Sequence, residues 1–251
     1  MLRREAVGAT WDDLRGWPAA LLLAWLLTML SMPLTNLLWG DRALLPTIVL
    51  TVLLQAGAGM ALLARAWGLC RTVLAAAVAL VLTWGLEAVG SATGFPFGAY
   101  HYTERLQPQL AHVPLLIPLA WLMMLPPAWA VGQRLSRGRS RLVFVVLSAL
   151  AFTAWDLCLD PQMVRWGLWV WEQPGGYFGI PWVNYLGWLL GAALVTAAAR
   201  PRDLPERPLL LLYGLTWLLE SVGLVLFWGL PGPALCGFVG MGVFVLLVVR
   251  T

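Results

Sequence analysis

The chain has 251 residues, of which 61% are hydrophobic and 11% are charged, and its formal net charge is +4. This composition excludes a soluble globular domain and indicates a polytopic membrane protein. All basic residues are arginines in short segments between apolar runs, where positive charge sets membrane topology, so the charge does not indicate a nucleic-acid partner.

Eight apolar runs are long enough to cross a bilayer as helices. They cover residues 17–38, 44–66, 72–89, 113–133, 142–159, 181–199, 208–230 and 234–249, the last being the shortest. The segment before the first run has mixed charge and no small-residue cleavage site, so we expect a retained span and not a signal peptide. The fold class is therefore expected to be all-α, a single transmembrane bundle over residues 1–251.

With eight spans, all arginines except Arg42, Arg105 and Arg165 fall on one side of the membrane. Cytoplasmic loops are enriched in arginine, so we expect both termini in the cytoplasm of a protein of the bacterial cytoplasmic membrane. The two long loops, residues 94–112 and 160–181, then lie on the opposite, arginine-poor side.

Acidic side chains within the spans gather toward that arginine-poor side. Asp156 and Asp160 are one helical turn apart on one face, at the predicted end of the fifth span and before an aromatic, glycine-rich hairpin. Glu87 and Glu220 lie in the third and seventh spans, and Asn184 lies in the first turn of the sixth. A carboxylate at membrane depth is costly, so these residues are predicted to form a functional site.

Two similar segments within the chain support this convergence. Residues 83–90 read TWGLEAVG and residues 216–223 read TWLLESVG, in helices that run the same way. This indicates a parallel four-plus-four repeat with halves 1–133 and 134–251, although coincidence in a biased composition is the alternative. A true repeat would place Glu87 and Glu220 across a central cavity from one another.

Two carboxyls as close as Asp156 and Asp160 do not both ionise easily in a low-dielectric setting, so one is expected to hold a proton and serve as a general acid. The competing interpretation for Asp160, which precedes Pro161, is a helix cap. Glu87 and Glu220 could instead form ion pairs with Arg105 or Arg165, and Asn184 could bond backbone in the hairpin.

Aromatic residues of the two long loops are placed to close the pocket or contact a substrate. The candidates are Tyr100, His101, Tyr102, Trp169, Tyr177 and Phe178 in these loops, together with Trp155 in the fifth span. Aromatic faces stabilise carbocations, yet tryptophans and histidines at this depth also serve as interfacial residues. The sequence has no paired cysteines, HExxH motif, phosphate-binding glycine loop or GxSxG elbow, so no metal site or cofactor is predicted.

Three segments carry a family resemblance: GFPFGAYHYT, VPLLIPLAWLMM and TAWDLCLDPQMVRWGLWVWEQPGGYFGIPWVNYLGW, within residues 87–188. They resemble the membrane carotenoid-biosynthesis family that includes bacterial gamma-carotene and lycopene hydratases and the archaeal bisanhydrobacterioruberin hydratase. The resemblance implies a hydro-lyase that adds water to the C1–C2 double bond of an acyclic carotenoid end, without a redox cofactor. The carotenoid would enter the pocket laterally from the lipid bilayer.

That chemistry requires an acid, a surface that stabilises a tertiary cation, and a positioned water. We expect Asp156 or Asp160 to be the acid, with the other carboxylate and Glu87 stabilising the cation or accepting a proton. Glu220 and Asn184 would orient the water. The alternatives are a proton-coupled transporter with buried carboxylates and, more weakly, a magnesium-dependent prenyltransferase, whose diphosphate would lack basic partners here.

Overall fold

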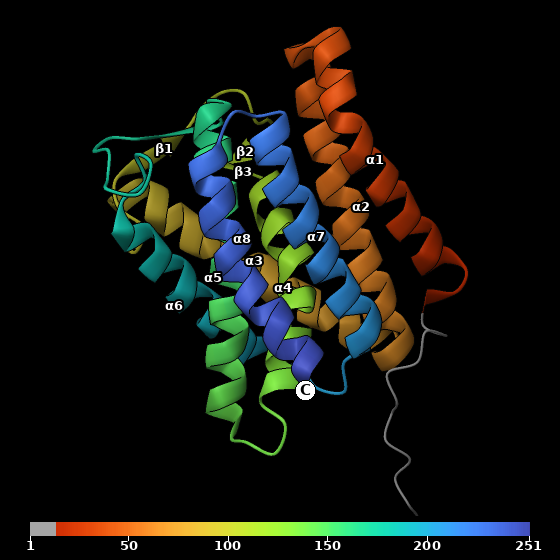
Figure 1. Cartoon of the computed structure of the whole chain (residues 1–251). Coiled ribbons are helices and arrows are strands. Elements are labelled where there is room, and N and C mark those ends of the chain that lie inside the picture. Colours follow the sequence, from red (N-terminus) through yellow and green to blue (C-terminus); the bar gives the residue numbers. More distant parts are fainter. Residues whose placement is uncertain (1–13) are drawn as a thin grey trace, which may run out of the picture.

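The computed structural model describes residues 14–251, over which eight helices are long and apolar enough to cross a membrane (Figure 1). The helices are α1 (Trp17–Trp39), α2 (Asp41–Trp67), α3 (Leu69–Thr93), α4 (Leu116–Leu135), α5 (Arg141–Arg165), α6 (Trp182–Ala199), α7 (Glu206–Leu226) and α8 (Pro231–Arg250). The predicted all-α bundle and its eight spans are confirmed. Arg3 and Arg4, which contribute to the predicted arginine asymmetry, lie outside the described residues.

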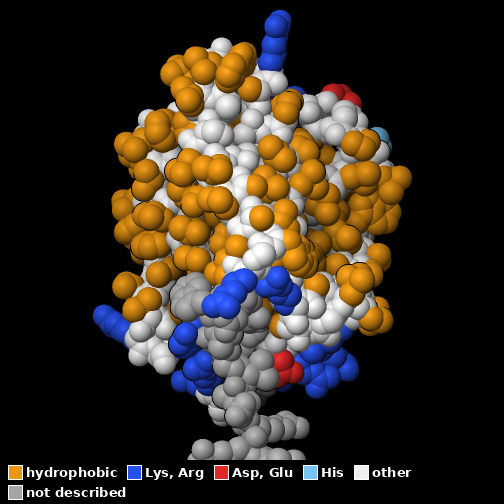
Figure 2. Space-filling model, turned by 90° about the vertical axis from the view of Figure 1, so that its right-hand side faces the viewer, with side chains coloured by type: hydrophobic (Ala, Val, Ile, Leu, Met, Phe, Trp, Pro, Cys, Tyr) orange, Lys and Arg blue, Asp and Glu red, His pale blue; other side chains and the backbone are white. Residues whose placement is uncertain are grey.

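Helix α4 is the centre of the bundle. Fourteen of its residues are buried, and it packs against α2, α3, α5 and α7. Helix α1 has the opposite character, because it packs mainly against α2 and leaves most of its leucines exposed. On the face shown in Figure 2, the exposed apolar side chains form a broad belt, as expected for a lipid-facing surface.

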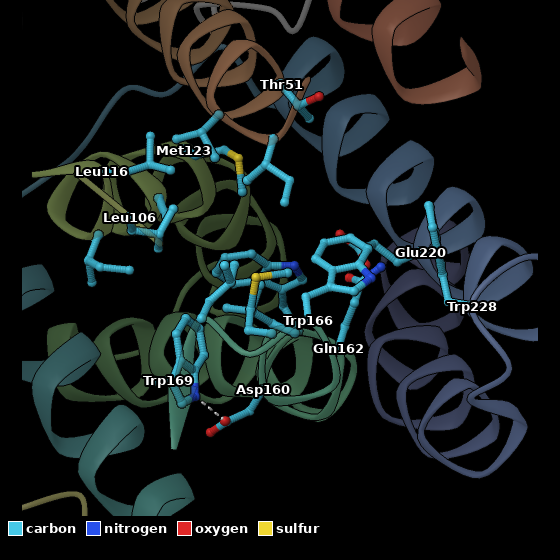
Figure 3. A pocket seen from close by; sticks show the side chains of 18 of the residues that line it. Thr51, Leu106, Leu116, Met123, Asp160, Gln162, Trp166, Trp169, Glu220 and Trp228 are labelled. Atoms are coloured by element: carbon cyan, nitrogen blue, oxygen red, sulfur yellow. Dashed lines mark hydrogen bonds between the residues drawn. The ribbon is translucent and has the colours of Figure 1, made fainter. Parts of the chain in front are cut away.

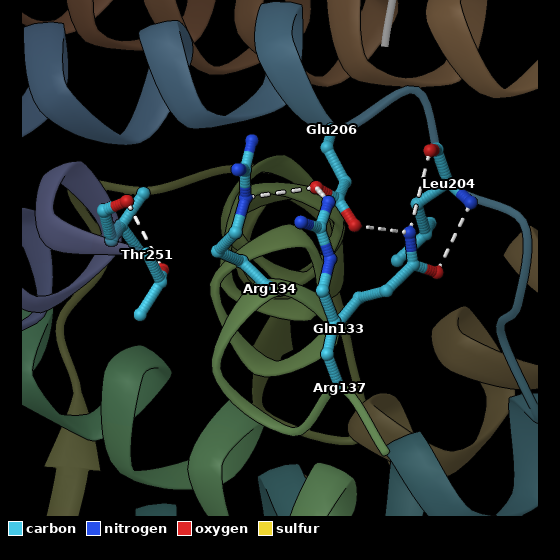
Figure 4. A network of polar contacts seen from close by, with 7 residues as sticks. Gln133, Arg134, Arg137, Leu204, Glu206 and Thr251 are labelled. Atoms are coloured by element: carbon cyan, nitrogen blue, oxygen red, sulfur yellow. Dashed lines mark hydrogen bonds and ion pairs between the residues drawn. The ribbon is translucent and has the colours of Figure 1, made fainter. Parts of the chain in front are cut away.

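Arginines gather at one end of the bundle, below the apolar belt (Figure 2). At this arginine-rich end, the buried Glu206 carboxylate at the start of α7 pairs with Arg134 Nε at 2.9 Å and Arg137 Nη2 at 2.6 Å. Gln133 Nε2 donates a further hydrogen bond of 2.9 Å to Glu206 (Figure 4). These contacts tie the end of α4 to the beginning of α7.

The two long loops meet at the arginine-poor end. Strand β1 (Tyr100–Tyr102) pairs antiparallel with β4 (Trp169–Trp171), and β2 (Gln109–Leu110) pairs with β3 (Val113–Pro114). The predicted hairpin is therefore corrected: local antiparallel bridges are confined to residues 175–180, while β4 finds its partner in the other loop. The pairing places Tyr100 opposite Trp171 and Tyr102 opposite Trp169.

Helix α5 continues past its predicted end at residue 159 and reaches Arg165, with Pro161 inside it. Proline lacks the N–H that would bond the carbonyl one turn earlier. The freed carbonyl of Leu157 instead accepts a 2.8 Å hydrogen bond from the Tyr177 hydroxyl. Asp160 therefore lies within a helix, and the cap interpretation is wrong.

Candidate active site

One cavity of about 260 Å³ lies in the arginine-poor half of the bundle, beneath the paired loops. Its lining comes from α1 to α7 and from both strands of the β1–β4 pair, and most of it is apolar. Its polar and ionisable lining residues are Thr51, Gln55, Glu87, Tyr100, Tyr102, Asp160, Gln162, Asn184 and Glu220. Figure 3 shows Asp160, Glu220 and Thr51 on different elements around this space, with the Asp160 carboxyl directed toward the Trp169 indole.

The aspartate pair lies at one side of the cavity. Asn184 Nδ2 donates to Asp156 Oδ2 at 3.0 Å and to Asp160 Oδ2 at 2.5 Å, so one amide bridges both carboxyls. Asp160 Oδ1 also accepts hydrogen bonds from the indoles of Trp169 at 2.7 Å and Trp171 at 3.3 Å. Three N–H donors thus fix the orientation of the carboxyl group that lines the cavity.

Asp156 lies behind Asp160. It is completely buried and does not line the cavity, and its Oδ1 has no hydrogen-bond partner among residues 14–251. The two aspartates and Asn184 form a compact group in which only Asp160 and Asn184 reach the open space. Asn184 therefore acts on the aspartates directly and does not bond the hairpin backbone through its side chain.

Glu87 forms a second acidic centre on α3. Its Oε2 accepts hydrogen bonds from the hydroxyls of Tyr100 at 2.6 Å and Tyr102 at 2.7 Å, and its Oε1 accepts one from the Trp121 indole at 3.0 Å. Burial, together with the charge of Glu87, raises the pKa of Tyr100 and of Tyr102 above the ordinary 10.0. Both phenols consequently stay protonated and remain hydrogen-bond donors to the Glu87 carboxyl group.

Glu220 forms a third acidic centre on α7. It lines the same cavity as Glu87. Its polar neighbour is the indole of Trp155. The Trp155 N–H lies near Glu220 but does not meet hydrogen-bond geometry with any residue that the structure describes. Within residues 14–251 neither Glu87 nor Glu220 forms the alternative ion pair with Arg105 or Arg165, and Arg105 pairs with Asp41 at 3.0 Å.

Tryptophan rings form much of the remaining wall. Trp121 stacks on Trp188 with ring centroids 4.7 Å apart, and Trp155 meets Trp188 edge to face at 6.0 Å. All three line the cavity and are buried. The cavity therefore combines carboxyl groups with extended π surfaces, which together suit a transient cation.

The remaining predicted site residues lie elsewhere. His101 is exposed on β1, between the two inward tyrosines, and does not line the cavity. Tyr177 is buried outside the cavity, and Phe178 is 53% exposed and packs against Gly232. Sequence reasoning missed Trp121, Trp188, Thr51 and Gln55. For Gln55 the signal was a lone amide within an apolar span.

A family model described as carotenoid biosynthesis protein matches residues 47–244. The chain belongs to this family. All the cavity carboxyls and their partners lie within the matched region of this carotenoid biosynthesis protein, whereas α1 lies outside it.

A relative from Haloarcula japonica, named bisanhydrobacterioruberin hydratase, is 38% identical over 123 residues. The alignment covers 47% of this chain and 42% of the relative, so the chain spans less than half of the curated protein that it matches. No solved structure is similar enough to count as a match.

Proposed function

We propose that this protein is a carotenoid 1,2-hydratase that adds water to the terminal C1–C2 double bond of an acyclic carotenoid end of the lycopene or gamma-carotene type. The observation that carries the proposal is one apolar cavity that Asp160, Glu87 and Glu220 all line. Family membership and the name of the Haloarcula japonica relative support the same reaction class.

The aspartate pair supplies the acid. Asp156 and Asp160 share one amide donor and lie side by side, so together they hold a proton more easily than two negative charges. Asp160 is the member that faces the cavity. It donates the proton to C2, the less substituted alkene carbon, and the alkene π electrons form the new C–H bond.

The tertiary cation left at C1 is stabilised by charge and by aromatic faces. Glu87 presents a negative carboxylate that three donors hold in place. The walls formed by Trp121, Trp155 and Trp188 supply cation–π attraction in a cavity whose lining is mostly apolar. Water then attacks C1, and its surplus proton passes to Glu220 as base. The sum of the steps is addition of one water without a cofactor.

Substrate access is proposed between α1 and α7. Among the residues that line the cavity, only Leu30 on α1, Val222 on α7 and Phe227 at the end of α7 are largely exposed, at 58%, 42% and 57%. They face the side that would contact lipid, where a polyene insoluble in water would be dissolved. The cavity volume lies below the roughly 300–1,000 Å³ of sites that enclose a drug-sized ligand, so only the carotenoid end would enter.

The test is expression of the full chain in cells that make lycopene or gamma-carotene, followed by mass analysis of their pigments. A product heavier by one water, absent from cells with an empty vector, is expected. Unchanged pigment would reject the hydratase. Proton flux into vesicles that contain the purified protein would then favour the transporter alternative.

A further inference from the structure

Thr51 on α2 is unusual among the helical threonines. The hydroxyls of Thr47 and Thr216 donate to the carbonyl one turn earlier in their own helices, at 2.7 Å and 2.9 Å. Thr51 is 7% exposed and lines the cavity, and its buried hydroxyl has no hydrogen-bond partner among the described residues. A buried polar group of this kind requires a partner that the protein itself does not supply.

Gln55 lies one turn from Thr51 on the same face of α2. Its Nε2 donates to Thr216 Oγ1 at 3.1 Å and contacts Met124 Sδ at 3.4 Å, which fixes the side-chain amide. Within residues 14–251 no donor reaches its Oε1, although Gln55 is buried and lines the cavity. Gln55 therefore adds a fixed side-chain carbonyl to the part of the cavity lining that Thr51 belongs to.

The α2–α7 geometry brings Glu220 to this group. The two helices run in opposite directions, and the Gln55–Thr216 hydrogen bond sets their register. One turn from that bond toward the arginine-poor end lies Thr51 on α2 and Glu220 on α7. In Figure 3 the Thr51 side chain comes from α2 beside the α7 ribbon, which also carries Glu220.

We propose that Thr51, Gln55 and Glu220 bind the water that attacks the carotenoid, an inference that rests on the proposed hydratase function. The Thr51 hydroxyl donates to the water oxygen, and the water donates to Gln55 Oε1 and to the Glu220 carboxylate. Three polar partners are what a buried water requires. The site lies on α2 and α7, whereas the acid Asp160 lies on α5, so proton donor and water approach the alkene from different elements.

The step balances without another reactant. The water oxygen forms a bond to C1 of the cation, one O–H bond breaks, and the proton goes to Glu220. Thr51 and Gln55 are positioning residues for this water, and Glu220 is the base. Without a positioned water, the cation instead loses a proton from C2 or a neighbouring methyl group and returns to an alkene.

This competition provides a test in D2O with purified full-length protein and lycopene in lipid vesicles. Thr51→Val keeps the side-chain shape and removes the hydroxyl. We expect about a tenfold lower hydration rate, because one hydrogen bond to the water is lost. Deuterium is expected to accumulate in the recovered carotenoid, because protonation still occurs. Thr51→Ser should restore hydration, and Thr47→Val is the matched control on the same helix.

The inference is overturned if Thr51→Val hydrates at the wild-type rate, or if hydration and deuterium exchange fall in the same proportion. A proportional loss would leave the ratio of water capture to proton loss from the cation unchanged. It would therefore indicate a structural defect. If the wild-type protein neither hydrates lycopene nor exchanges deuterium, the proposed function itself fails. Wild-type hydration with an unaffected Thr51→Val variant rejects only the water site.

Discussion

The Tyr177 hydroxyl donates a 2.8 Å hydrogen bond to the backbone carbonyl of Leu157, four residues before Pro161. This bond replaces the helical one that proline cannot make. It lies between Asp156 and Asp160 along α5, although Tyr177 does not line the cavity. The loop after α5 therefore supports the backbone that presents both aspartates.

Tyr177→Phe is expected to lower stability by about 1 kcal/mol, because a buried carbonyl loses its only replacement partner. It should also reduce hydration, since the aspartates sit on the weakened turn. Thermal unfolding in detergent and pigment turnover would measure the two effects. Tyr185→Phe is the matched control, because the Tyr185 hydroxyl has no hydrogen-bond partner among the described residues. Equal behaviour of the two variants would contradict this role.

Asp160→Asn is expected to reduce hydration by roughly 10²–10⁴-fold, the usual contribution of a general acid. The amide keeps the size of the side chain but cannot donate a carboxyl proton. Deuterium exchange into carotenoid in D2O should fall with hydration, because protonation comes first. Near-normal exchange in Asp160→Asn would transfer the acid role to another carboxyl, with Asp156→Asn the next variant to measure.

The fold was predictable because its main determinants are local. Each span is an apolar run whose backbone must be satisfied within its own helix, so length and hydropathy sufficed to place eight helices. The end of α5 was not predictable in this way. Pro161 normally signals a helix end, and the compensating hydroxyl of Tyr177 comes from 20 residues away.

The carboxyl groups of the site were also predictable, because buried charge is rare and costly in a membrane. Their partners were not. The β1–β4 pairing, which brings Tyr102 and Trp169 to the same face, depends on contacts between two separate loops. Thr51 resembles an ordinary helical threonine, and the lone amide of Gln55 within an apolar span does not by itself show that the residue lines a cavity.

Glu206→Gln tests the network at the arginine-rich end of the bundle. The change removes the charge that pairs with Arg134 and Arg137 and leaves both cations near a neutral amide. We expect a loss of about 2 kcal/mol in stability, since hydrogen bonds to charged groups contribute about 1.5–3 kcal/mol. Turnover per folded molecule should not change, because Glu206 does not line the cavity. Unaltered thermal unfolding would show that the network adds nothing to stability.

Val222→Trp tests the proposed access route between α1 and α7. Val222 is 42% exposed and lines the cavity, so an indole there would narrow the opening without touching Asp160 or Glu87. We expect about a tenfold higher KM for lycopene in vesicles with a smaller change in kcat, because restricted access weakens binding more than chemistry. Leu186→Trp is the matched control: Leu186 is 52% exposed on α6 and does not line the cavity. A KM that rises equally in both variants, or in neither, would place the access route elsewhere.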